Sequence, residues 1–103
     1  MAAEAFNRKA SPNDAKALGY LNDVRERVGM PALSLSGSQL TEAIWNERRL
    51  ELSGEGFRFW DLVRTGRAAD EIDGFVVGKH ELFPIPQIEI DLAGGNWNQN
   101  PDY

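Results

Sequence analysis

The sequence L-T-E-A-I-W-N-E-R-R-L-E-L, at residues 40–52, decides the fold. One face of a helix through this stretch carries apolar side chains with a single carboxylate among them: Leu40, Ala43, Ile44, Glu47 and Leu50. A second stripe beside it contains Trp45, Arg48 and Leu52. A helix that is apolar over so much of its circumference is usually covered on most sides, so the stretch predicts a buried α-helix.

A further helix is predicted directly after this one. Gly54 and Gly56 break the helical pattern. The short helix that follows has four side chains on one face: Phe57, Trp60, Asp61 and Arg64. Residues 38–72 are therefore expected to hold the buried helices of the chain.

Two more helices are predicted upstream, over residues 1–28. Residues 1–9 are good helix formers without a preceding capping residue. Ser11 and Pro12 offer an N-cap and a first helical residue for the next helix, and Gly29 marks its end. The pattern predicts a helix hairpin of the kind that stacks in repeat arrays.

Helical periodicity disappears after residue 72. Residues 73–103 hold four glycines and three prolines, and only residues 75–77 and 80–85 suit short extended segments. Thirty residues without regular structure are unusual inside a small domain. The predicted fold class is therefore mainly α, a helix hairpin and buried helices followed by an irregular tail. We expect the chain to be a fragment of a larger all-α fold.

Composition and charge exclude several classes of protein. The 103 residues are 42% hydrophobic and 26% charged, which is typical of a globular protein, and no cysteine is present for disulfides, thiol catalysis or lipid attachment. No apolar run is long enough to span a membrane. The formal net charge is −5, and residues 68–103 carry seven acids against one lysine. Without a basic stripe, nucleic acid is not an expected partner.

Glu47 lies on the apolar stripe, so its carboxylate is expected to be shielded from water. A buried charge needs a partner, and Arg58 and Arg64 follow on the next helix. We predict a structural ion-pair network with five members that locks two helices: Glu47, Arg48, Arg58, Asp61 and Arg64.

A catalytic alternative pairs Glu47 with Glu51, Glu55 or Asp61 as the two carboxyls of a glycosidase. Such chemistry needs one protonated carboxyl, whereas the interleaved arginines favour ionised carboxylates. The structural interpretation is preferred, so no catalytic residue and no cofactor are expected. His80 is the only histidine and has no second metal-ligating partner nearby, so no metal site is expected either.

Trp97 lies in a polar loop, residues 94–100, rich in glycine and asparagine. An exposed indole flanked by amides can stack on a sugar ring while the amides bond its hydroxyl groups. Packing of Trp97 against another part of a larger protein explains the pattern equally well. Trp97 is the one candidate ligand-binding residue.

Five stretches in order resemble motifs of the C-terminal region of the SusD/RagB family. Residues 20–31 (Y-L-N-D-V-R-E-R-V-G-M-P) and 43–52 (A-I-W-N-E-R-R-L-E-L) resemble two helical motifs of the family. Residues 54–66 (G-E-G-F-R-F-W-D-L-V-R-T-G) resemble its E-G-x-R-x-x-D-L-x-R-x-G stretch. Residues 82–86 and 99–103 resemble its closing motifs, with Asp102 where the family often has glycine, which favours a type I last turn.

The resemblance implies a non-catalytic protein that binds glycans or other nutrients. Members of this family are mainly helical, with tetratricopeptide-like helix pairs. They are lipoproteins on the surface of the bacterial outer membrane, where they hand oligosaccharides to a SusC-like, TonB-dependent transporter. The matched motifs look structural, so no binding residue is transferred from the family. The alternative is a helical-repeat module that binds protein and no sugar.

Overall fold

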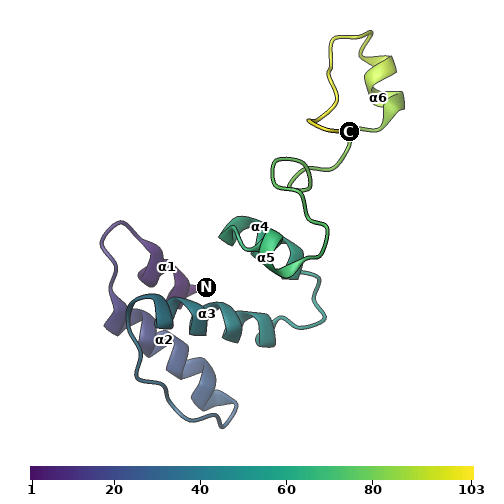
Figure 1. Cartoon of the computed structure of the whole chain (residues 1–103). Helices are drawn as coiled ribbons and strands as arrows, with labels where there is room; N and C mark the ends of the chain where they lie inside the picture. Colours follow the sequence, from purple (N-terminus) through teal and green to yellow (C-terminus); the bar gives the residue numbers. More distant parts are fainter. The chain divides into compact units, whose positions relative to one another are not determined.

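The computed structural model describes all of residues 1–103 and contains six helices and no β-strand. The helices are α1 (Ala2–Arg8), α2 (Asp14–Arg27), α3 (Gly37–Glu51), α4 (Arg58–Thr65), α5 (Ala68–Glu71) and α6 (Gln87–Leu92) (Figure 1). They form two compact units, Met1–Gly56 and Phe57–Tyr103. The predicted fold class, mainly α with an irregular tail, is confirmed.

The first unit, Met1–Gly56, packs α1, α2 and α3 around a small apolar core. Five buried side chains form this core: Ala3, Ala17, Leu21, Leu40 and Ile44. On α3, the predicted stripe is buried only as far as Glu47, because Leu50 is 60% exposed. The prediction that α3 is covered on most sides is wrong for this unit, since α1 and α2 contact one side of it.

Hydrogen bonds between the helices show how they run. Asp14 at the start of α2 accepts from the backbone N–H of Gly37 at the start of α3 (2.6 Å), and Arg27 near the end of α2 donates to Glu51 at the end of α3 (2.5 Å). Helices α2 and α3 therefore run side by side in the same direction. The linker between them returns along α2, where the Asn22 amide bonds both the N–H and the C=O of Leu33.

Helix α2 begins two residues later than predicted. Its N-cap is Asn13, whose side chain accepts from the backbone N–H of Lys16 at 3.0 Å. The amide oxygen of Asn13 makes the capping bond that was assigned to the hydroxyl of Ser11, and Pro12 precedes the cap instead of following it. The predicted N-cap was therefore wrong, although the helix itself is present.

Helix α2 ends at Arg27, and Gly29 is the left-handed residue that terminates it, as predicted. The backbone N–H of Met30 donates to the C=O of Arg25 (2.8 Å), and that of Gly29 donates to the C=O of Glu26 (3.0 Å). These two bonds form a Schellman motif, which requires a left-handed residue, and Gly29 has a φ of 74°.

We expect Gly29→Ala to lower the free energy of unfolding by about 1 kcal/mol, because a Cβ strains the left-handed conformation. Gly19 is the matched control, since it lies inside α2 with open space around its Cα. Gly19→Ala should raise the free energy of unfolding by about 0.5–1 kcal/mol. Urea denaturation followed by circular dichroism measures both, and equal effects of the two substitutions would contradict the motif's role.

The second unit, Phe57–Tyr103, has a much smaller buried core, since only Leu62 and Ala68 are buried. An aromatic cluster adds to this core. The ring centroid of Phe59 lies 5.2 Å from that of Trp60 and 6.4 Å from those of Phe75 and Phe83. Helix α6 in the tail was not predicted, because six residues are too few to show helical periodicity.

The tail contains turns where extended segments were expected. The backbone N–H groups of Lys79 and His80 both donate to the C=O of Val76, so residues 76–80 form a tight turn. The last turn also differs from the expectation, because Asp102 has a φ of 64°, which excludes a type I turn. Aspartate tolerates this left-handed conformation better than most residues, so the turn keeps the geometry that glycine would favour.

Candidate functional site

The buried carboxylate of Glu47 is the first candidate site residue, and it is ion-paired. Glu47 is 7% exposed, and its Oε2 lies 2.7 Å from Nη1 of Arg25. The two side chains are 10% and 12% exposed. Arg25 also donates from Nε to the C=O of Pro31 (3.0 Å), so its guanidinium joins the end of α2, the linker and α3.

Arg58 and Arg64, the predicted partners of Glu47, belong to the second unit, and their pairing with Glu47 stays a prediction. Within the first unit Glu47 pairs with Arg25, which the sequence pattern did not indicate. The reason lies in the parallel course of α2 and α3, which sets residues 22–24 positions apart side by side. The length of the linker was the available signal for a parallel arrangement of the two helices. Residues 28–36 can span about 3.3 Å per residue, whereas the 14 residues of α2 rise only about 1.5 Å each, so the linker is long enough to return along α2.

Glu51, one of the carboxylates of the catalytic alternative, is also ion-paired. Glu51 accepts from Arg27 at 2.5 Å, with side chains 33% and 62% exposed. Glu47 and Glu51 are thus each held by an arginine of α2. Both carboxylates are therefore used in ion pairs between helices, which suits a structural role.

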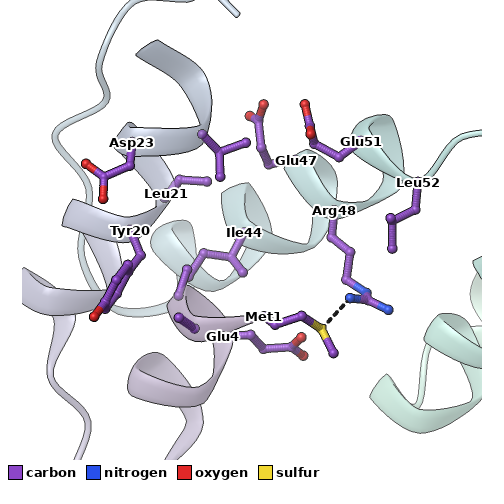
Figure 2. Close-up of a pocket in the computed structure, with 13 residues that line it drawn as sticks. Met1, Glu4, Tyr20, Leu21, Asp23, Ile44, Glu47, Arg48, Glu51 and Leu52 are labelled. Carbon is purple, nitrogen blue, oxygen red and sulfur yellow. Dashed lines mark hydrogen bonds between the residues drawn. The ribbon is translucent and has the colours of Figure 1, made fainter. Parts of the chain in front are cut away.

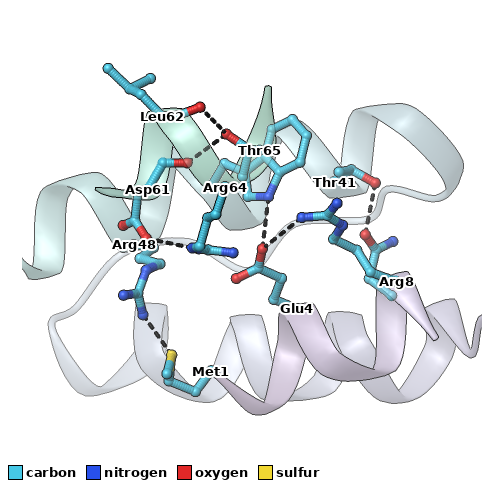
Figure 3. A network of polar contacts seen from close by, with 11 residues as sticks. Met1, Glu4, Arg8, Thr41, Arg48, Asp61, Leu62, Arg64 and Thr65 are labelled. Atoms are coloured by element: carbon cyan, nitrogen blue, oxygen red, sulfur yellow. Dashed lines mark hydrogen bonds and ion pairs between the residues drawn. The ribbon is translucent and has the colours of Figure 1, made fainter. Parts of the chain in front are cut away.

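A second buried carboxylate, Glu4 on α1, was missed by sequence reasoning. Glu4 is 8% exposed, and its Oε1 accepts from Nε1 of Trp45 (3.1 Å) and from Nη1 of Arg8 (3.4 Å) (Figure 3). One turn further along α1, the side chain of Asn7 accepts from the hydroxyl of Thr41 (2.7 Å). Polar contacts therefore hold α1 against α3, and Trp45 contributes a hydrogen bond as well as packing.

A cavity of about 360 Å³ lies in the first unit, between α1, α2 and α3. Leu21, Ile44 and Leu52 supply apolar walls, and Glu47 and Glu51 line it from α3 (Figure 2). Arg48 also lines it and donates from Nη1 to the sulfur of Met1 (2.6 Å). The cavity has the size of a small-ligand pocket.

The remaining predicted network residues form ion pairs within the second unit. Arg58 pairs with Glu71 at 2.8 Å, and Arg67 pairs with the same carboxylate at 2.6 Å. Arg64 pairs with Asp61 at 2.8 Å along α4 (Figure 3). The prediction of one network joining Glu47, Arg48, Arg58, Asp61 and Arg64 stays a prediction.

His80 has a structural position in the second unit. Its Nδ1 accepts from the backbone N–H of Val76 (2.9 Å), and its ring lies edge-on to Phe75 with centroids 5.6 Å apart. No group of three or more histidine, aspartate or glutamate side chains in the chain is placed to hold a metal ion.

Trp97, the candidate ligand-binding residue, is 54% exposed. It follows α6 and two glycines in the left-handed region, Gly94 and Gly95. The side chain of Asn96 donates to the C=O of Ala93 (2.9 Å), so this flanking amide is used within the loop. The indole has no ring contact and no hydrogen bond to any other residue of the chain.

None of the helices has the length and apolarity needed to cross a lipid bilayer. The model of the SusD family matches residues 1–80. SusD-like protein P38 of Formosa agariphila is 39% identical, over 66% of this chain and 15% of that protein. SusD-like protein P25 of the same organism is 39% identical, over 89% of this chain and 20% of that protein.

A solved structure agrees with these similarities. Surface glycan-binding protein A from Bacteroides thetaiotaomicron matches with a TM-score of 0.78 and 38% identity, over 98% of this chain and 22% of that one. The chain thus spans between 15% and 22% of the length of these relatives. Sequence motifs, helical fold and family model agree, and this chain belongs to the SusD family.

Proposed function

We propose that this chain is the C-terminal part of a longer, non-catalytic protein that binds oligosaccharides at the surface of the bacterial outer membrane. The protein passes its ligand to a SusC-like, TonB-dependent transporter and needs no cofactor. The chain supplies structural elements: a helix hairpin over residues 1–28, buried helices over 38–72 and an irregular tail over 73–103.

One observation carries the proposal: the similarity to surface glycan-binding protein A, which extends over 98% of this chain with a TM-score of 0.78. Two further features support a binding role over a catalytic one. Glu47 and Glu51, the acids that a hydrolase would need, are both ion-paired to arginines. Trp97 offers a half-exposed indole, a side chain of the type that stacks on sugar rings.

The test is affinity electrophoresis of the native-length protein in gels containing starch, laminarin, xylan, pectin or alginate. We expect slower migration in at least one of these gels. Hydrolysis of the retained glycan by the protein, abolished by Glu47→Gln, would contradict the non-catalytic role.

Within the same protein, Trp97→Ala should weaken glycan binding by about tenfold. Stacking of a nucleic-acid base on an aromatic side chain, a comparable interaction, contributes about 1–3 kcal/mol per base. Leu92→Ala is the matched control, since Leu92 is an apolar side chain of the same tail that is 77% exposed. Dissociation constants from gels of increasing glycan content measure both. An unchanged constant for Trp97→Ala would remove Trp97 from the site.

A second candidate function, a helical-repeat module that binds protein, is favoured by the apolar cavity between α1, α2 and α3. Such cavities accept side chains of a partner helix. Absence of retardation by every glycan in the panel, together with binding of a SusC-like transporter, would support this alternative.

A further inference from the structure

The tail folds back on itself because the side chain of Gln99 bonds the backbone of Ile85, in the pattern that a neighbouring β-strand would use. Oε1 of Gln99 accepts from the backbone N–H of Ile85 (2.7 Å), and Nε2 of Gln99 donates to the C=O of the same residue (2.8 Å). In an antiparallel sheet, a neighbouring residue makes this same pair of bonds with its backbone. Pro84 and Pro86 have no N–H group, so Ile85 offers the one backbone donor within residues 84–86.

Two further side chains strengthen this attachment. Nδ2 of Asn100 donates to the C=O of Phe83 (2.6 Å), and the hydroxyl of Tyr103 donates to the C=O of Leu82 (3.0 Å). We call Gln99, Asn100 and Tyr103 the clasp. It closes residues 86–98 into a loop whose two ends are held together by hydrogen bonds.

Trp97 lies in this loop, two residues before Gln99. The indole makes no hydrogen bond and no ring contact, and Gly94 and Gly95 on its N-terminal side offer little restraint of their own. The position of the indole therefore depends on the backbone, which is held on one side by the two bonds of Asn96 to the C=O of Ala93 and on the other side by the clasp. Gln99 and Asn100 also bond each other, because the Asn100 N–H donates to Oε1 of Gln99 (2.9 Å).

We infer that Gln99, with Asn100 and Tyr103, acts as a positioning residue for glycan binding through Trp97. The inference rests on the proposed function and deepens it. In this inference the clasp does not contact the sugar, because the amides of Gln99 and Asn100 are hydrogen-bonded to the backbone of residues 83 and 85. Its effect is to order the loop before the ligand arrives, which lowers the entropy lost when the indole stacks.

The experiment measures glycan dissociation constants of the native-length protein by affinity electrophoresis, in a double-mutant cycle. Gln99→Ala should weaken binding about three- to tenfold in the wild-type background, the range expected from freeing one to two side chains. In the Trp97→Ala background, the same substitution should leave the constant unchanged. Gln87→Ala is the matched control, because Gln87 bonds only Asp91 within α6 and lies outside the clasp.

Tyr103→Phe provides a milder second variant, which removes a single hydrogen bond and should weaken binding about twofold. Equal weakening by Gln99→Ala in both backgrounds would show a general structural role and overturn the inference. No weakening in the wild-type background would also overturn it. Glycan binding that survives Trp97→Ala unchanged would reject the Trp97 contact while leaving glycan binding by the protein intact.

Discussion

Replacing Leu40 by alanine should lower the free energy of unfolding by about 2–5 kcal/mol, the largest effect we expect from a single apolar substitution. Leu40 is 0% exposed and lies on α3 at the centre of the first unit's core, against Ala17, Leu21 and Ile44. The substitution removes the burial of three carbon atoms and leaves a cavity that the short helices fill only in part.

Leu50 supplies the matched control for this prediction. It lies on the same helix and was predicted on the same stripe, yet it is 60% exposed. Leu50→Ala should change the free energy of unfolding by no more than about 0.5 kcal/mol. Urea denaturation of both variants, followed by circular dichroism, measures the difference. Similar losses for the two leucines would mean that the core does not end where the structure places it.

Glu47→Gln should lower the free energy of unfolding by about 3–5 kcal/mol. The substitution removes the negative charge beside Arg25, whose side chain is only 12% exposed, and leaves a guanidinium without a counter-charge away from water. Breaking one side of a buried pair costs more than the pair itself contributes, because the remaining ion is poorly solvated.

The exposed pair one turn further along α3 is the control for Glu47. Glu51→Gln removes the negative charge beside Arg27, whose side chain is 62% exposed, and should cost less than about 1 kcal/mol. Replacing Arg25 and Glu47 together by methionine and leucine should recover most of the loss, because no charge is then left unpaired. A loss for Glu47→Gln no greater than that for Glu51→Gln would refute the buried ion pair.

Periodicity predicted the helices where it was long enough to be seen. Helix α3 has a stripe of apolar residues over ten positions, and α2 has a clear stop at Gly29, so both could be expected from the sequence. The start of α2 was misplaced because Ser11 and Asn13 are both good capping residues and spacing alone does not rank them. Helix α6 was missed because it spans less than two turns.

The candidate site was predicted in part for a similar reason. The burial of Glu47 follows from its place on an apolar stripe, which is a local property of one helix. The position of Arg25 beside Glu47 depends on the course of the linker between α2 and α3, and a periodic pattern of apolar residues does not predict that course. The clasp of Gln99 on Ile85 is a side-chain bond across 14 positions, and it leaves no signal in composition or spacing.

The clasp has a consequence for self-association. Residues 82–86 carry exposed apolar side chains, with Leu82 48% and Phe83 67% exposed, a feature that favours pairing between chains. Three of the segment's carbonyl groups, those of Leu82, Phe83 and Ile85, already accept bonds from the clasp. We therefore expect a second molecule to find few free backbone groups to pair with along this segment.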